Sequence, residues 1–166
     1  MAVLPIVAWP DPRLRQVCDP VPFAADRKAL IADMFETMYA APGRGLAGPQ
    51  VGVMERIFVM DVTWKDGTPE PVACINPEII QRSDAVVARE EACLSIVGVA
   101  AEVTRPAEIL IRWFDPDWHE HQARLTGFHA TCAQHENDHL DGRVIFDHQT
   151  PEVRAILEQA YAGGTA

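Results

Sequence analysis

The sequence predicts an α+β fold, with antiparallel or mixed β-sheets packed around a central helix and a further helix near the C-terminal end. Strand-like runs cluster in the middle of the chain without a helix after each one, which excludes the strict alternation of a doubly wound α/β protein. Apolar residues recur at helical spacing in only a few segments. With 166 residues and no linker-like stretch, residues 1–166 are expected to form one domain.

The N-terminal part of the chain is expected to be extended before the first helix begins. The segment from Leu4 to Pro22 contains five of the thirteen prolines and is predicted to be a strand followed by turn-rich chain, because proline excludes a regular helix. The first helix then ends at Pro42 and Gly43. Its core face is predicted from apolar residues three and four positions apart: Leu30, Ile31, Met34, Phe35 and Met38.

A glycine-rich loop and a series of strands follow this helix. Strand-like runs cover residues 56–62, 72–75, 79–88, 103–113 and 121–126, with turns predicted at Asn76-Pro77 and two other sites, Asp66-Gly67 and Asp115-Pro116. A second helix is expected from about Phe128 to Leu140. The last helix is expected from Pro151, with Thr150 as its N-cap, to about Tyr161.

Charge and cysteine content exclude several classes of protein. The formal charge is 14 − 24 = −10, which argues against a nucleic-acid partner bound by bulk electrostatics. No apolar run approaches the roughly 18 residues of a membrane span, and the segment from Met1 to Trp9 lacks the basic start of a signal peptide. Four cysteines without a C-x-x-C pair fit a reducing, cytoplasmic location, where a functional cysteine is catalytic or binds metal.

The clearest chemical signal is an H-E-x-x-H motif in the second predicted helix, from His135 to His139. Positions four apart lie on one helix face, so both imidazoles can reach one metal ion. Such a metal lowers the pKa of its water to about 7, and Glu136 can take the proton and later pass it to a leaving amine. The pattern fixes only three positions, so it is also compatible with a solvated polar helix face.

The residues alone leave the third metal ligand open. Ile145 stands where metzincins place a third histidine, which excludes that class. Glu158 lies near the distance at which gluzincins place a glutamate, although a surface position on the last helix fits it as well. A cysteine thiolate is the remaining alternative, because a thiolate and two imidazoles suit Zn²⁺ or Fe²⁺.

Three motifs in the same order make the sequence resemble the peptide deformylase family. The segment from Gly43 to Gln50 matches G-x-G-L-A-A-x-Q except at Gly48. The segment from Glu91 to Ser95 matches E-G-C-L-S except at Ala92, and 134–142 match Q-H-E-x-D-H-L-x-G completely. Weaker similarity extends the resemblance over about residues 6–147, so it covers nearly the whole chain.

The resemblance implies a role for each matched position. Cys93, His135 and His139 would hold one divalent metal ion, preferably Fe²⁺, with Zn²⁺, Ni²⁺ or Co²⁺ as alternatives. Glu136 would be the general acid and base, and the side chain of Gln50 and the backbone N–H of Leu94 would stabilise the oxyanion. Asp138 and Gln134 would orient ligands. Substrate binding would fall to Gly45, which would let the peptide backbone approach as an added strand, and to Arg44, Glu91, Ala92, Phe128, Thr131 and Cys132.

The function implied is removal of the N-formyl group from the formylmethionine of nascent polypeptides, with release of formate. Ala92 replaces a glycine beside the expected peptide, and Arg44 and Arg89 place guanidinium groups near an otherwise apolar pocket, unless both extend into solvent. Ala92 and Arg44, together with Ala100 where many family members carry an arginine, motivate an alternative, a deformylase-like metallohydrolase with altered N-acyl or formyl preference and little activity on formyl-Met peptides. A binding protein with a vestigial site and an endopeptidase that uses Glu158 are weaker alternatives.

Charge also bears on a ribosomal partner. Deformylases are thought to dock on the ribosome partly through a basic C-terminal helix. Here residues 151–166 contain only Arg154 against Glu152 and Glu158. A net-negative tail suits ribosomal RNA poorly, so we expect weak, salt-insensitive ribosome association at best.

Overall fold

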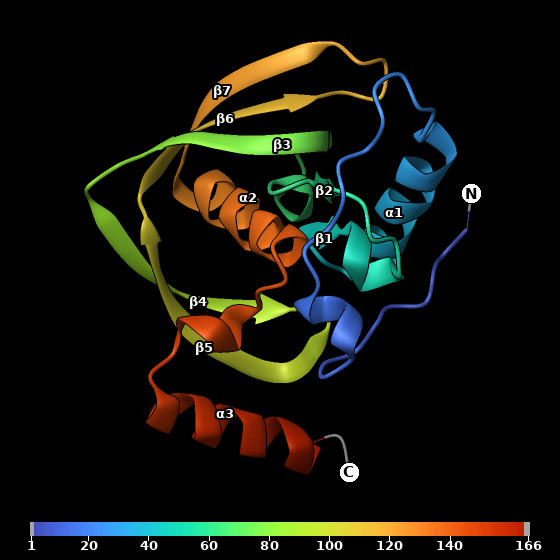
Figure 1. Ribbon diagram of the computed structural model, residues 1–166. Helices are drawn as coiled ribbons and strands as arrows, with labels where there is room; N and C mark the ends of the chain where they lie inside the picture. The colour runs from blue at the N-terminus through green and yellow to red at the C-terminus, as the bar shows by residue number, and fades with distance from the viewer. Residues whose placement is uncertain (1, 165–166) are drawn as a thin grey trace.

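In the computed structural model, which describes residues 2–164, helix α2 (Gly127–Leu140) lies between two antiparallel sheets (Figure 1). One sheet has the strand order β1-β2-β3-β6-β7, and the other is the hairpin of β4 and β5. This is the α+β arrangement that the sequence predicts. The strands are β1 (Gly45–Ala47), β2 (Ile57–Met60), β3 (Val72–Arg82), β4 (Val86–Cys93), β5 (Ile96–Pro106), β6 (Glu108–Phe114) and β7 (Glu120–Thr126).

The other two α-helices cover the outer sides of these sheets. Helix α1 (Lys28–Ala40) buries Met34 and Met38 against the β1–β2 end of the larger sheet. Helix α3 (Pro151–Gly164) lies along the outer face of β5, as Figure 1 shows at its lower edge. The predicted cap of α3 is confirmed, since the hydroxyl of Thr150 accepts a hydrogen bond from the Val153 N–H at 3.3 Å. No helix in the described part of the chain is long and apolar enough to cross a membrane.

Helix α2 buries polar side chains along much of its length. Its apolar residues, among them Ala133 and Leu140, pack against the larger sheet with Phe58 and Ile111. A buried polar group costs free energy unless it has a partner, so a buried polar helix face indicates a functional or tightly bonded site. The buried polar residues of α2 are Thr131, Gln134, His135, Glu136, Asn137 and His139.

The strand predicted at the N-terminus is not present. Residues 2–8 are irregular, and single hydrogen bonds rather than a ladder hold the chain at Val7 and Trp9. The Val7 N–H donates to the carbonyl of Gln50 at 2.7 Å, and the Trp9 N–H donates to the carbonyl of Ser95 at 2.9 Å. Prolines on both sides of this segment remove the donors that a regular ladder needs.

Three predicted strand boundaries are also wrong. Asn76-Pro77 is a bulge inside β3 rather than a turn, and Asn76 adopts a φ of 49° there. Its side-chain amide exchanges two hydrogen bonds, of 2.8 and 2.9 Å, with the backbone of Val21. Conversely, the runs predicted over 79–88 and 103–113 each contain a break, after Arg82 and at Ala107, because the chain passes there from one sheet to the other.

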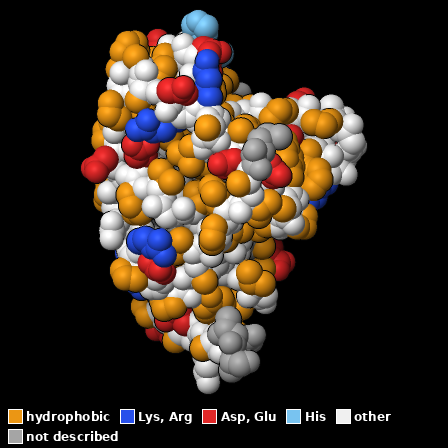
Figure 2. Space-filling model, turned by 90° about the vertical axis from the view of Figure 1, so that its right-hand side faces the viewer, with side chains coloured by type: hydrophobic (Ala, Val, Ile, Leu, Met, Phe, Trp, Pro, Cys, Tyr) orange, Lys and Arg blue, Asp and Glu red, His pale blue; other side chains and the backbone are white. Residues whose placement is uncertain are grey.

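The charges on the face over α1 are mixed rather than gathered (Figure 2). On the face over α1, Figure 2 shows the blue basic side chains lying beside red acidic ones, without a continuous basic patch. The ion pair of Arg27 with Glu55, at 2.7 Å, is one example.

Candidate metal centre and active-site pocket

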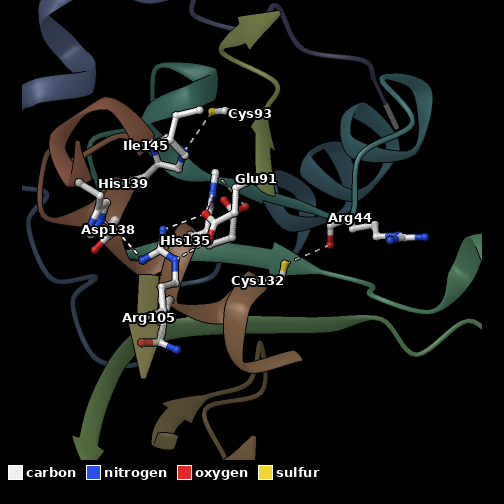
Figure 3. A network of polar contacts seen from close by, with 12 residues as sticks. Arg44, Glu91, Cys93, Arg105, Cys132, His135, Asp138, His139 and Ile145 are labelled. Atoms are coloured by element: carbon white, nitrogen blue, oxygen red, sulfur yellow. Dashed lines mark hydrogen bonds and ion pairs between the residues drawn. The ribbon is translucent and has the colours of Figure 1, made fainter. Parts of the chain in front are cut away.

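Three ligand-type side chains converge where the end of β4 meets α2. Cys93 is the last residue of β4, and His135 and His139 lie one turn apart on α2. Their sulfur and ring nitrogen atoms all lie within 4.8 Å of one another, and Cys93 Sγ is 3.5 Å from His139 Nε2 (Figure 3). All three residues are buried, so the cluster is a preformed group of donors.

The protonation state of Cys93 suits metal binding. Burial alone raises the pKa of this thiol, but the imidazoles of His139 and His135 lower it to about 5. At neutral pH the sulfur is therefore a thiolate, the form that binds metal. One thiolate and two imidazoles are a donor set for Zn²⁺ or Fe²⁺, whereas Mg²⁺ and Ca²⁺ prefer oxygen. The residues present therefore fit a divalent transition metal.

Glu136 lies beside this cluster with a free carboxylate oxygen. Its Oε1 is 4.0 Å from His135 Nε2, and its Oε2 is buried without a hydrogen-bond partner among the residues that the structure describes. Burial raises the pKa of this carboxyl, although the two imidazoles oppose the shift. A carboxyl with a raised pKa can both accept and return a proton near neutral pH.

Gly45 is needed for a reason that the sequence does not show. A Cβ at this position would lie 2.5 Å from Oε1 of Glu136 and 2.9 Å from the sulfur of Cys132. Gly45 is expected to admit the substrate backbone. Because it has no Cβ, it also leaves room for the Glu136 carboxylate. Any larger residue would displace that carboxylate.

The amide of Gln50 is held in one orientation. Its Oε1 accepts a hydrogen bond from the Ala47 N–H at 3.0 Å, which leaves Nε2 as the donor on the other side. This Nε2 lies 3.1 Å from the hydroxyl of Ser95 and 3.6 Å from Cys93 Sγ. Ser95, which we had not singled out as a functional residue, therefore helps to aim the Gln50 donor at the cluster.

A buried ion-pair network supports His135 from behind. Glu91 accepts two hydrogen bonds from the guanidinium of Arg105, at 2.7 and 2.9 Å, and its Oε1 lies 2.9 Å from His135 Nδ1 (Figure 3). Arg105 also donates to Asp138 at 2.9 Å, and Asp138 lies 2.7 Å from His148 Nε2. The His135 Nδ1 proton is thus directed to Glu91, which leaves Nε2 for a metal.

This network adds detail to what was expected of single residues. Glu91, predicted to contact substrate, lines the pocket, and both of its carboxylate oxygens already have partners in Arg105 and His135. Burial alone raises the pKa of this carboxyl, but hydrogen bonds from His135 and Arg105 lower it overall. Arg105 was not predicted as a member of the site at all. Gln134 does not touch the cluster, since its amide donates to the carbonyls of Pro106 and Ala130.

The other candidate ligand lies elsewhere. Glu158 is on α3, where its carboxylate pairs with Arg154 at 2.8 Å. Its position leaves Cys93 as the third donor in the H-E-x-x-H cluster. Cys132 lines the pocket as expected, and its thiol lies 3.6 Å from the Arg44 carbonyl. Burial and the carboxylates of Glu136 and Glu91 raise the pKa of the Cys132 thiol well above its usual value, which argues against a reactive role.

A pocket of about 440 Å³ opens above the cluster. Cys93, His135, Glu136 and Gln50 form part of its lining, and the remainder is mostly apolar. Phe128 lines it with 60% of its surface exposed, and the guanidinium of Arg89 lies over the Phe128 ring at 4.5 Å. The predicted substrate residues Arg44, Gly45, Glu91, Ala92, Phe128, Thr131 and Cys132 all contribute to this lining, as does Leu94.

The fold is α+β, helix α2 carries a buried H-E-x-x-H motif, and the Cys93 thiolate lies beside that motif below an open pocket. Together these features define a metallohydrolase of the thiolate-containing H-E-x-x-H class. Comparison with known proteins specifies the family. The model of the polypeptide deformylase family matches residues 3–155. The chain belongs to the polypeptide deformylase family, whose members are metalloenzymes.

Individual relatives agree with this assignment. The chain is 48% identical over 154 residues to a peptide deformylase of Rhizorhabdus wittichii, which covers 89% of this chain and 87% of that protein. The crystal structure of a Legionella pneumophila peptide deformylase superposes with a TM-score of 0.91 at 33% identity, over 99% of this chain and 96% of that one. A peptide deformylase of Ehrlichia chaffeensis in complex with actinonin gives a TM-score of 0.91 at 36% identity, with 98% of each chain covered.

Proposed function

We propose that the protein removes the formyl group from the N-terminal formylmethionine of nascent polypeptides and releases formate. The observation that carries this proposal is the buried carboxylate oxygen Oε2 of Glu136, which has no hydrogen-bond partner within residues 2–164 and lies in a pocket lined by Cys93 and His135. Membership of the deformylase family supplies the reaction class. Nascent chains are made in the cytoplasm, and we propose that location for the enzyme.

We further propose one divalent ion, Fe²⁺, as the cofactor. Cys93 Sγ, His135 Nε2 and His139 would hold it, and the bond from His135 Nδ1 to Glu91 would fix that ring. When bound, such an ion lowers the pKa of water to about 7 and so supplies a nucleophile at neutral pH.

The protein side chains then carry the remaining steps. Glu136 takes a proton from the attacking water and passes it to the amine nitrogen as the bond to the formyl carbon breaks. Negative charge develops on the formyl oxygen during the attack. The Nε2 donor of Gln50 and the N–H of Leu94 would stabilise that charge, each by about 3 kcal/mol in a water-poor site. The bond from the Ala47 N–H to Gln50 Oε1 keeps this donor in place before substrate binds.

Formate release from formyl-Met-Ala-Ser is the test of this proposal. Protein loaded separately with Fe²⁺, Ni²⁺, Co²⁺ or Zn²⁺ is assayed, with acetyl-Met-Ala-Ser as the matched substrate control. We expect turnover of the formyl peptide only, fastest with Fe²⁺. Absence of formate with every metal would contradict the proposal. Faster cleavage of the acetyl peptide, followed by the free N-terminal amine that it produces, would favour the alternative of altered acyl preference.

We also propose that the enzyme acts on nascent chains without tight ribosome binding. Arg154, the single basic residue of α3, already pairs with Asp147 at 2.7 Å and with Glu158 at 2.8 Å. Because its guanidinium is already neutralised by two carboxylates, Arg154 should attract a phosphate backbone only weakly. Purified protein is expected to stay in the supernatant when ribosomes are pelleted, at low and at high salt. Co-sedimentation that salt reverses would contradict this expectation.

A further inference from the structure

The mouth of the pocket carries two exposed cations, Arg44 and Lys65, which we call the basic rim. Most basic side chains in residues 2–164 lie beside a carboxylate, as Arg27 does with Glu55 at 2.7 Å. Within that part of the chain, neither Arg44 nor Lys65 has a carboxylate partner. In a protein of net charge −10, two such cations lining one pocket call for a functional explanation.

The fold brings these two residues to the same wall of the pocket. Lys65 lies in the short helix η3 (Trp64–Asp66), and the indole N–H of Trp64 donates to the carbonyl of Gly43 at 2.9 Å. The Asp61 N–H donates to the carbonyl of Arg44 at 2.9 Å. These two bonds attach the η3 loop to the segment before β1, so both cations are held near each other on backbone that is fixed.

The exposed charge at the pocket mouth is positive. The carboxylates that line the pocket belong to Glu91 and Glu136, which are only 6% and 4% exposed, and Glu91 is paired with Arg105. No other acidic residue in the described part of the chain lines the pocket. Asp66, which follows Lys65 in η3, lies outside the lining. A substrate in the pocket is therefore closer to the positive charges of the basic rim than to the acidic residues that give the protein its net negative charge.

The basic rim lies outward from the reacting bond. Gly45 abuts the Glu136 carboxylate, Arg44 is the next residue, and Figure 3 shows the Arg44 side chain directed away from the cluster. An extended peptide rises about 3.3 Å per residue, so the two residues that follow the formylated one lie about 3–7 Å further out. Resting on the proposed function, we propose that the basic rim selects formylated peptides with an acidic side chain at one of these two positions.

Three matched peptides test this proposal: formyl-Met-Ala-Glu, formyl-Met-Ala-Gln and formyl-Met-Ala-Lys, each with an amidated C-terminus. Exposed ion pairs change an equilibrium constant by about two- to five-fold. We therefore expect kcat/KM to rise about two- to five-fold from Gln to Glu and to fall by a similar factor from Gln to Lys. The change should appear in KM, because the contact is made equally in the ground and transition states, and should shrink as salt is added.

Variants assign the preference to these residues. In the double variant Arg44→Gln/Lys65→Gln, the ratio of the Glu to the Lys peptide should fall close to one. Arg82→Gln is the matched control, because Arg82 is an exposed arginine at the end of β3 that does not line the pocket, and it should keep the wild-type ratio. Equal kcat/KM for the three peptides, or an unchanged ratio in the double variant, would overturn the proposal.

A binding measurement keeps this inference separate from the proposed function. Titration calorimetry of metal-loaded protein with the three peptides lacking the formyl group needs no turnover. If no formyl peptide is hydrolysed, the proposed function fails, and the calorimetric order Glu above Gln above Lys still supports selection by the basic rim. An equal affinity for the three peptides would overturn it.

Discussion

Replacing Glu136 with Gln is expected to lower kcat for formyl-Met-Ala-Ser by about 10²–10⁴-fold, the range for loss of a general acid and base. The amide keeps the size of the side chain but cannot accept the proton. Since Glu136 is not among the three clustered donors, the variant should bind as much metal as the parent. The measurements are formate release and metal content on the same preparation. Turnover within ten-fold of the parent would contradict the assigned role.

Replacing Cys93 with Ser provides the contrasting variant, because it should lose activity through loss of metal. A serine hydroxyl has no thiolate to offer, and soft transition metals prefer sulfur. Co²⁺ bound to the parent and to Glu136→Gln should show thiolate-to-cobalt absorption in the near ultraviolet, and Cys93→Ser should not. If Cys93→Ser retained both the bound metal and its affinity, Cys93 would not be a ligand.

The parts of the site that the sequence predicts are those that local spacing determines. The helical repeat alone puts His135 and His139 on one face of a helix, with Glu136 beside them. Once a helix is expected here, the face of α2 that carries the metal-binding side chains can therefore be predicted. The link of Cys93 to that helix depends on how the β4–β5 hairpin packs, which only the motif resemblance indicated. The structure brings these residues together, and their chemical roles stay proposals until the variants are measured.

The errors arise where distant segments decide a local conformation. Asn76-Pro77 has the composition of a turn, but two hydrogen bonds exchanged between the Asn76 side chain and the backbone of Val21, 55 residues away, hold it as a bulge within β3. Glu91 and Arg105 are 14 residues apart, and their meeting depends on the register of β4 and β5. Arg105 lies opposite Val87 in the ladder, and Glu91 lies opposite Ala101. The two residues are therefore not ladder partners, and the contact between their side chains cannot be read from the strand pairing alone.

The buried pair of Arg105 and Glu91 is expected to give the largest stability effect in the chain. Replacing Arg105 with Met should lower the free energy of unfolding by about 3–5 kcal/mol, because it leaves the Glu91 carboxylate buried without its cation. Both side chains are only 5% exposed, and their shortest contact is 2.7 Å. Urea unfolding of metal-free protein measures this cost without a contribution from altered metal affinity.

Two further variants separate the lost charge partner from the lost side chain. Arg112→Met breaks the contact with Glu78, which is 2.6 Å long but has side chains 41% and 62% exposed, so it should cost at most about 1 kcal/mol. In the double variant Glu91→Gln/Arg105→Met the unpaired Glu91 charge is gone and Asp138 keeps its contact with His148. Much of the stability should therefore return, since replacing both partners is far less costly than removing one. If Arg105→Met cost no more than Arg112→Met, the network would not be a structural support of His135. If the double variant were as unstable as Arg105→Met, packing rather than the buried charge would explain the loss.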